Sequence, residues 1–185
     1  MLYNVAQLLK EHVGASRHYE IAGELQNVDE YNPGAVPVDG EVTFIRTPRG
    51  ILAKGIAHLS LVQPCRRCLE LTKADVRFDF EEEYIPSIDI ETGAALPITD
   101  EDEEELIIDE HHILDLSEVL RQYAVIEASR GALCAVECKG LCPTCGANLN
   151  EGPCGCIREN LDPRLAELAK LLGSDQDRET ERKNE

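Results

Sequence analysis

The chain has 185 residues, of which 43% are hydrophobic and eight are cysteine, and its formal net charge is −18. A chain this acidic cannot bind nucleic acid through general electrostatic attraction, because neutralising phosphates requires clustered lysine and arginine. No stretch approaches the roughly 18 consecutive apolar residues of a membrane helix, and the first residues show no signal-peptide pattern. We therefore expect a cytoplasmic protein with no membrane partner.

The first half of the chain shows the pattern of a short helix followed by a β-sheet. Residues Asn4–His12 place their apolar side chains on one helical face, and Gly14 follows as a stop. The strand-like runs, several of which alternate apolar and polar residues, are Tyr19–Leu25, Glu41–Thr47, Ile51–Val62 and Glu70–Phe80. Turn signals lie at residues 32–34, 39–40 and 48–50. We expect an α+β fold built on a curled antiparallel sheet or open barrel with flanking helices.

Residues 79–118 form an acidic segment with sixteen acidic residues and no lysine or arginine. Its stretch 86–105 is broken by proline and glycine and contains six consecutive acids, so we expect a mobile loop there. Residues 106–108 predict one more strand. The charge of the segment favours a basic protein partner over a nucleic acid.

The strongest helical pattern covers Asp115–Arg130. Asp115 with Glu118 resembles a capping box, and Gly131 stands just past the predicted end. The apolar stripe of this helix is Leu116, Val119, Leu120, Tyr123 and Ile126.

A cysteine-rich module covers residues 133–156, and a last helix is predicted to begin at Asp162-Pro163 and to end at Gly173. We expect a mainly β domain over residues 1–132, a zinc-knuckle module with its terminal helix over 133–172, and a disordered polar tail over 173–185.

The eight cysteines have the spacing of metal ligands. They form a first pair, Cys65-Arg-Arg-Cys68, and a later group, Cys134-x3-Cys138-x3-Cys142-x2-Cys145-x8-Cys154-x-Cys156. Disulfides are rare in a reducing compartment, whereas zinc takes four thiolates at tetrahedral corners. A Cys-x-x-Cys turn supplies two of these ligands, and a following glycine such as Gly146 suits the turn. Eight cysteines therefore predict two zinc ions.

Chain reach favours one division of the cysteines into two sites. Cys142, Cys145, Cys154 and Cys156 lie close enough in sequence to close around one ion with a small loss of entropy. The second site would then combine Cys65, Cys68, Cys134 and Cys138. The alternative joins Cys134, Cys138, Cys142 and Cys145, and leaves the first pair to reach Cys154 and Cys156.

Other functions of these residues remain open at this stage. The cysteines could be buried apolar residues or redox dithiols. Basic residues near the knuckles could contact phosphates in an RNA-binding module: Arg66, Arg67, Lys73, Arg77 and Lys139. No acid, base and nucleophile stand in a catalytic pattern, so we expect no enzymatic activity.

Three motifs make the chain resemble the YceD family. They are Cys65-Arg-Arg-Cys68-Leu69, Glu137-Cys-Lys-Gly-Leu-Cys-Pro-Thr-Cys-Gly146 and Gly152-Pro-Cys-Gly-Cys156. The family is associated with accumulation of large-subunit ribosomal RNA in bacteria and plastids. The resemblance therefore implies a role in ribosome assembly, with ribosomal components, including ribosomal RNA, as partners. Together with this role, the charge of residues 79–118 predicts a basic ribosomal protein as the partner of that segment. The resemblance implies no catalytic residues.

Overall fold

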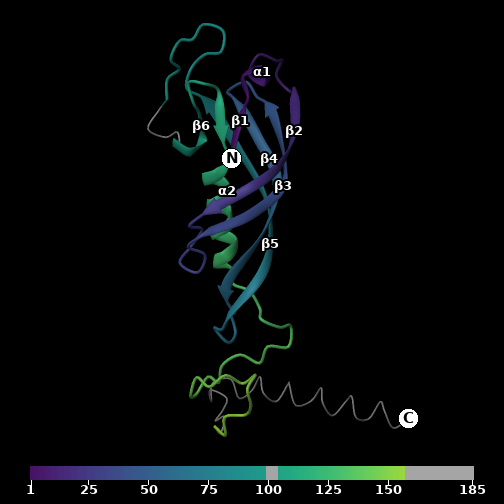
Figure 1. Cartoon of the computed structure of the whole chain (residues 1–185), viewed down its shortest axis with the longest axis vertical. Coiled ribbons are helices and arrows are strands. Elements are labelled where there is room, and N and C mark those ends of the chain that lie inside the picture. The colour runs from purple at the N-terminus through teal and green to yellow at the C-terminus, as the bar shows by residue number, and fades with distance from the viewer. Residues whose placement is uncertain (99–103, 157–185) are drawn as a thin grey trace, which may run out of the picture. The chain divides into compact units, whose positions relative to one another are not determined.

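A five-stranded sheet organises the first part of the chain (Figure 1). The computed structural model describes residues 1–98 and 104–156, and it divides the chain into one unit of residues 1–140 and a second unit that begins at Leu141. The sheet has the order β2-β3-β4-β5-β6, with β2 at Ser16–Gln26, β3 at Ala35–Arg46, β4 at Ile51–Pro64, β5 at Leu71–Pro86 and β6 at Ile107–Ile108.

The sheet is mixed, so the expectation of a wholly antiparallel sheet is wrong at one edge. Strands β2 to β5 pair antiparallel, but β6 pairs parallel to β5, with Ile85 opposite Ile107. Parallel neighbours need a longer connection than a hairpin, and the acidic segment between β5 and β6 supplies it. That connection includes the short 3₁₀ helix η1, Glu104–Leu106.

The sheet curls around α2, the helix Ser117–Ser129 (Figure 1). This helix contacts β2, β4 and β5. Because β2 and β5 are three positions apart in the sheet order, both can reach one helix only if the sheet bends toward it. The resulting half-barrel confirms the α+β class, and its interior is an aliphatic core in which Phe44, Leu61, Tyr84 and Leu120 are fully buried.

The predicted N-terminal helix over residues 4–12 is much shorter in the structure. Helix α1 covers only Ala6–Leu9, because the residues before it form strand β1, Leu2–Asn4, which pairs with β7, Ile113–Asp115. The signal for this pairing lies more than a hundred residues away in the sequence. A helical pattern read locally could not include it.

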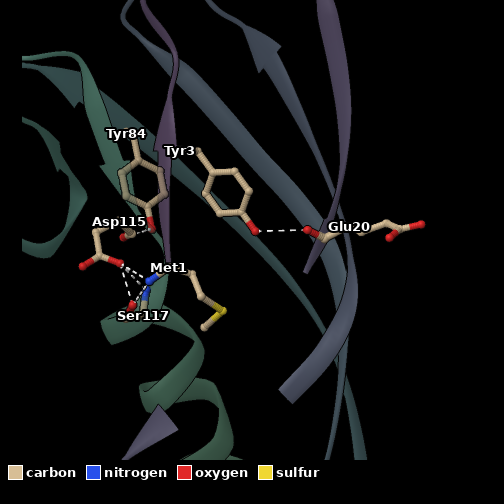
Figure 2. Close-up of polar contacts among 6 residues, drawn as sticks. All are labelled: Met1, Tyr3, Glu20, Tyr84, Asp115 and Ser117. Carbon is tan, nitrogen blue, oxygen red and sulfur yellow. Dashed lines mark hydrogen bonds and ion pairs between the residues drawn. The ribbon is translucent and has the colours of Figure 1, made fainter. Parts of the chain in front are cut away.

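Polar contacts join β1 to the sheet and to the start of α2 (Figure 2). The Tyr3 hydroxyl donates to the backbone oxygen of Glu20 at 3.3 Å, and the buried Tyr84 hydroxyl donates to that of Asp115 at 3.2 Å. The Met1 ammonium group contacts the Asp115 carboxylate at 2.7 Å and also donates to the Ser117 hydroxyl.

The capping box predicted for α2 does not form. The Asp115 carboxylate accepts the Ser117 amide proton at 2.9 Å, but the Glu118 carboxylate binds Arg121 at 2.8 Å instead of returning to the helix start. The predicted stop is confirmed, since Gly131 has a φ of 68° directly after the last turn. Ile126, which the sequence placed on the buried stripe, has 53% of its surface exposed, and Ala124 is buried.

One turn signal is wrong and another is confirmed. Asp39-Gly40 lies inside β3, where a side chain at Gly40 would come within 2.1 Å of the Ile56 backbone oxygen. The glycine permits a close approach of two strands rather than a turn. Residues 48–50 do form the β3–β4 turn, with the Thr47 amide donating to the Gly50 oxygen at 3.0 Å.

The acidic stretch predicted as a mobile loop contains a hydrogen-bonded turn in its described part. Ile88 bridges to Ala95, and the Asp89 carboxylate accepts the amide protons of Glu91 at 3.1 Å and Thr92 at 2.7 Å. Residues 99–103, the predicted helix from Asp162 and the predicted tail lie outside the described residues. Neither α1 nor α2 has the length and hydrophobicity needed to cross a membrane.

Candidate metal centres

Four cysteines from distant parts of the chain meet at the end of β4. Cys65 follows the last residue of β4, Cys68 lies in the β4–β5 turn, and Cys134 and Cys138 follow α2. The Cys65 and Cys138 sulfurs are 3.8 Å apart, and the Cys68 and Cys134 sulfurs are 3.6 Å apart. All four sulfurs lie within 4.8 Å of one another, so one ion could be bound by all of them. We call this group the first cluster.

The second cluster consists of Cys142, Cys145, Cys154 and Cys156, whose sulfurs also lie within 4.8 Å of one another. It belongs to the unit that begins at Leu141. Between residues 141 and 156 the structure has no helix or strand, only the bridge of Leu141 to Asn148. All eight cysteines are free of disulfides, and they are grouped as chain reach favoured.

Both Cys-x-x-Cys turns have the same backbone geometry. In the first cluster the Leu69 amide donates to the Cys65 oxygen at 2.8 Å, and the Cys65 amide donates to the Glu70 oxygen at 2.8 Å. In the second cluster the corresponding bonds, from Gly146 to Cys142 and from Cys142 to Ala147, measure 2.9 and 2.8 Å. The two turns are therefore equivalent, although only the second carries the expected glycine.

Leu69 takes the place of that glycine. It has a φ of 63°, close to the 75° of Gly146, which is a conformation that costs a residue with a side chain about 1–2 kcal/mol. Sequence analysis missed this strain. Aligning Cys65–Glu70 with Cys142–Ala147 would have revealed it.

Arg67 holds the two halves of the first cluster together. Its guanidinium donates to the backbone oxygens of Cys138 at 2.9 Å and Val136 at 3.2 Å. Gly140 packs closely against the Arg67 backbone: a Cβ atom at Gly140 would lie only 2.9 Å from the Arg67 backbone oxygen. A bridge between Cys65 and Ala132 completes the connection. The first unit therefore continues to residue 140, past the predicted domain boundary at 132.

The turn amides stabilise one thiolate in each cluster. Hydrogen bonds from the backbone of Cys134, Cys68 and Arg67 lower the pKa of Cys65 to about 6. Backbone hydrogen bonds from Cys145 and Thr144 likewise lower the pKa of Cys142 to about 6.

Further ionisation within each cluster is opposed by the neighbouring sulfurs. The side chain of Cys138, followed by that of Cys68, raises the pKa of Cys134 to about 12. The side chains of Cys145 and Cys154 likewise raise the pKa of Cys156 to about 12. A cation at the centre would remove this repulsion, as four thiolate ligands require.

The basic residues proposed from the sequence lie beside the first cluster and on β5. Arg66 is exposed beside the first cluster, and Arg67 donates to the carbonyl groups described above. Lys73 and Arg77 point outward from β5, opposite Val62 and His58 of β4, and Lys139 is exposed after Cys138. A role of these residues in nucleic-acid binding stays a prediction.

Comparison with known proteins gives one family match. Residues 53–172 match the family model described as large ribosomal RNA subunit accumulation protein YceD. An uncharacterized protein of Mycobacterium tuberculosis is 33% identical over 128 residues, which is 69% of this chain and 58% of that protein. A protein of Arabidopsis thaliana named large ribosomal RNA subunit accumulation protein YCED homolog 1, chloroplastic, is 29% identical over 174 residues.

The Arabidopsis alignment covers 83% of this chain and 54% of that protein. The chain thus spans little more than half the length of these relatives. No solved structure matches the chain significantly.

Proposed function

Because this chain belongs to the YceD family, we propose that it is a non-enzymatic zinc-binding factor that supports accumulation of large-subunit ribosomal RNA and ribosome assembly. One observation carries the zinc proposal: all eight cysteines of the two clusters fall within the matched region, residues 53–172. We place this function in a reducing compartment such as the cytoplasm, where the thiols would persist.

The sulfur distances support zinc as the metal. Zinc lies about 2.3 Å from each thiolate, so the sulfurs of a tetrahedral site are about 3.8 Å apart. The 3.8 and 3.6 Å distances in the first cluster fit that edge. Four protein ligands leave no open position for water or substrate, which is typical of structural rather than catalytic zinc.

A cationic partner would account for the acidic segment, residues 79–118. We propose a basic ribosomal protein, which this segment would attract before the protein meets its RNA. Such attraction acts mainly on the rate of association and weakens as salt is added.

Depletion of the protein in cells tests the main proposal. We expect the ratio of large-subunit to small-subunit ribosomal RNA to fall, and the intact chain to restore it. A variant with Cys68→Ser and Cys154→Ser should restore it poorly. Normal ribosomal RNA levels after complete depletion would show that the family role does not extend to this chain.

Elemental analysis of protein purified under reducing conditions tests the metal. We expect two zinc ions per chain. Eight reactive thiols without metal, which oxidise and reduce reversibly, would instead support a redox function. Iron in place of zinc would contradict the structural zinc sites.

A further inference from the structure

A pocket of about 390 Å³ lies beside the first cluster, within the first unit. Cys65 and Pro64 form part of its wall, and Val125 and Ala128 of α2 face them. Its volume is near the lower end of the range for small-ligand pockets, about 300–1,000 Å³. There is therefore room for one planar ring with its attached sugar.

Gln63 gives the pocket an unused hydrogen-bonding group. Its side chain lines the pocket and only 3% of the residue is exposed. Its carboxamide oxygen is buried and has no hydrogen-bond partner among the described residues. An unpaired buried acceptor destabilises the fold, and a side-chain rotation that brings this enclosed oxygen to a ligand's proton donor would remove that cost.

Tyr31 stands at the rim, with 42% of its surface exposed. Its loop is fixed by the neighbouring Asn32, whose carboxamide accepts the Val62 amide proton and donates to the Val62 oxygen, both at 2.9 Å. The Asp29 carboxylate also accepts the Tyr31 amide proton at 2.9 Å. These bonds fix the loop that carries Tyr31 beside Val62, the residue before Gln63, so that Tyr31 lines the pocket.

Two arginines lie at the mouth of the pocket in a protein that is otherwise strongly acidic. Arg66 is exposed, and its guanidinium makes no hydrogen bond or ion pair within the described parts of the chain. Arg130 lies nearby and pairs with Glu127 at 2.7 Å. Asp29 and Glu30 also line the pocket, so the formal charge there is balanced rather than negative.

We propose that this pocket binds one unstacked base of a single-stranded RNA. The base would stack on Tyr31, Arg66 would contact the adjacent phosphate, and a rotation of the Gln63 side chain would turn its enclosed oxygen toward an N–H group of the base. Proteins read single-stranded RNA in this way, by aromatic stacking and hydrogen bonds to base edges. The inference rests on the proposed function, since it names a point at which the protein would meet ribosomal RNA.

Fluorescence anisotropy with labelled single-stranded RNA of twelve mixed nucleotides tests the pocket, with the full chain in its zinc-bound form. Gln63→Met keeps the side-chain length but removes the polar group. We expect it to weaken binding about three- to tenfold while the melting temperature stays equal or rises. Tyr31→Leu, on an exposed loop, should weaken binding by a similar factor, whereas Tyr31→Phe should not.

Arg49→Gln is the matched charge control for Arg66→Gln, because Arg49 is exposed in the β3–β4 turn, outside this pocket and apart from the basic residues proposed to contact phosphates. Only Arg66→Gln should weaken binding clearly. Affinity unchanged in both Gln63→Met and Tyr31→Leu would overturn the proposal, as would tight binding of duplex RNA or of free nucleotide alone. Loss of binding to a ribosomal protein, with RNA affinity unchanged, would assign the pocket to a peptide instead.

Complementation separates this inference from the proposed function. If depletion lowers large-subunit ribosomal RNA and the Gln63→Met protein restores it fully, the pocket assignment is wrong while the function stands. If depletion has no effect on ribosomal RNA, the function itself is wrong.

Discussion

The residue that follows each Cys-x-x-Cys turn must adopt a left-handed conformation, and the two clusters meet this demand differently. Gly146 does so without strain, whereas Leu69 pays a steric cost with a side chain that is 64% exposed and packs little. The Leu69 side chain also borders the proposed RNA pocket. The Leu69 side chain is therefore placed for contact with a ligand rather than for packing in the core.

Leu69→Gly should stabilise the first cluster. It removes a strain of about 1–2 kcal/mol, offset partly by the flexibility that glycine gives the unfolded chain, roughly 0.5–1 kcal/mol. Thermal unfolding and zinc competition with a chelator would measure the gain. Gly146→Leu is the reciprocal variant, and it should weaken zinc retention at the second cluster. A lower melting temperature for Leu69→Gly would show that the leucine side chain contributes more by packing than its conformation costs.

At the candidate site, sequence reasoning predicted how the cysteines group but not the contacts that support them. The grouping of the cysteines follows from short loops, which depend only on spacing along the chain. The carbonyl contacts of Arg67 and the unpaired oxygen of Gln63 depend on which backbone segments meet in space. The spacing of cysteines along the chain carries no information about such contacts between distant segments.

At the scale of elements, Asn32 substitutes for a strand where β3 has separated from β4. The last paired residues of these strands are Val38 and Leu59, and beyond them the Asn32 carboxamide bonds to both backbone groups of Val62. A side chain thus completes the β4 edge and fixes the loop that carries Tyr31.

Asn32→Ala should lower the free energy of unfolding by about 2–3 kcal/mol, because it leaves two backbone groups of Val62 without partners. Chemical denaturation would measure this loss. Gln26→Ala, on the exposed end of β2, is the control and should change stability by less than about 0.5 kcal/mol. Equal effects of the two substitutions would mean that water replaces Asn32 at the strand edge.

The long strands could be predicted because their alternation is local: β2 and β4 contain the expected runs, and β3 and β5 contain theirs except for Thr47 and Glu70. The strand predicted at residues 106–108 is confirmed as β6, but its parallel pairing with β5 could not be predicted. The short strands β1 and β7 could not be predicted either, because each is defined by a distant partner rather than by its own pattern. Gly40 shows the same limit. In the sequence Asp39-Gly40 predicts a turn, whereas in the structure Gly40 permits close contact with the Ile56 backbone.

At the scale of the whole molecule, the two clusters should contribute unequally to stability. The first joins the β4–β5 turn to the segment after α2, within the unit that holds the hydrophobic core. The second closes a short stretch in which the described residues form no helix or strand. Metal bound at either cluster would be coupled to folding, but the first cluster closes a much longer loop.

Cys68→Ser should therefore lower the melting temperature of the sheet by about 5 °C or more, whereas Cys154→Ser should change it by less than about 2 °C. Scanning calorimetry would give both values, and elemental analysis should find one zinc ion fewer in each variant. Similar shifts in the two variants would mean that the second cluster also supports the sheet.

Several acids of the acidic segment serve the fold. Glu81 pairs with Lys54 at 2.8 Å, and the Glu82 carboxylate accepts the Tyr123 hydroxyl proton at 2.9 Å. Other acids of the segment with contacts inside the molecule are Glu83, Asp89, Asp109, Asp115 and Glu118. The six consecutive acids at residues 100–105 have the highest density of negative charge in the segment, so we propose them as the part that attracts a basic ribosomal protein.

Replacing residues 100–105 with alternating serine and asparagine should leave the melting temperature and zinc content unchanged. It should slow association with a basic ribosomal protein and flatten its salt dependence, because the local field that steers the encounter is lost. Stopped-flow measurements at several salt concentrations would test this. The control removes the same charge from the outer sheet surface, at Glu20, Glu24, Asp39, Glu41, Asp75 and Asp79. If both variants slow association equally, net charge steers the encounter and the acidic run has no special role.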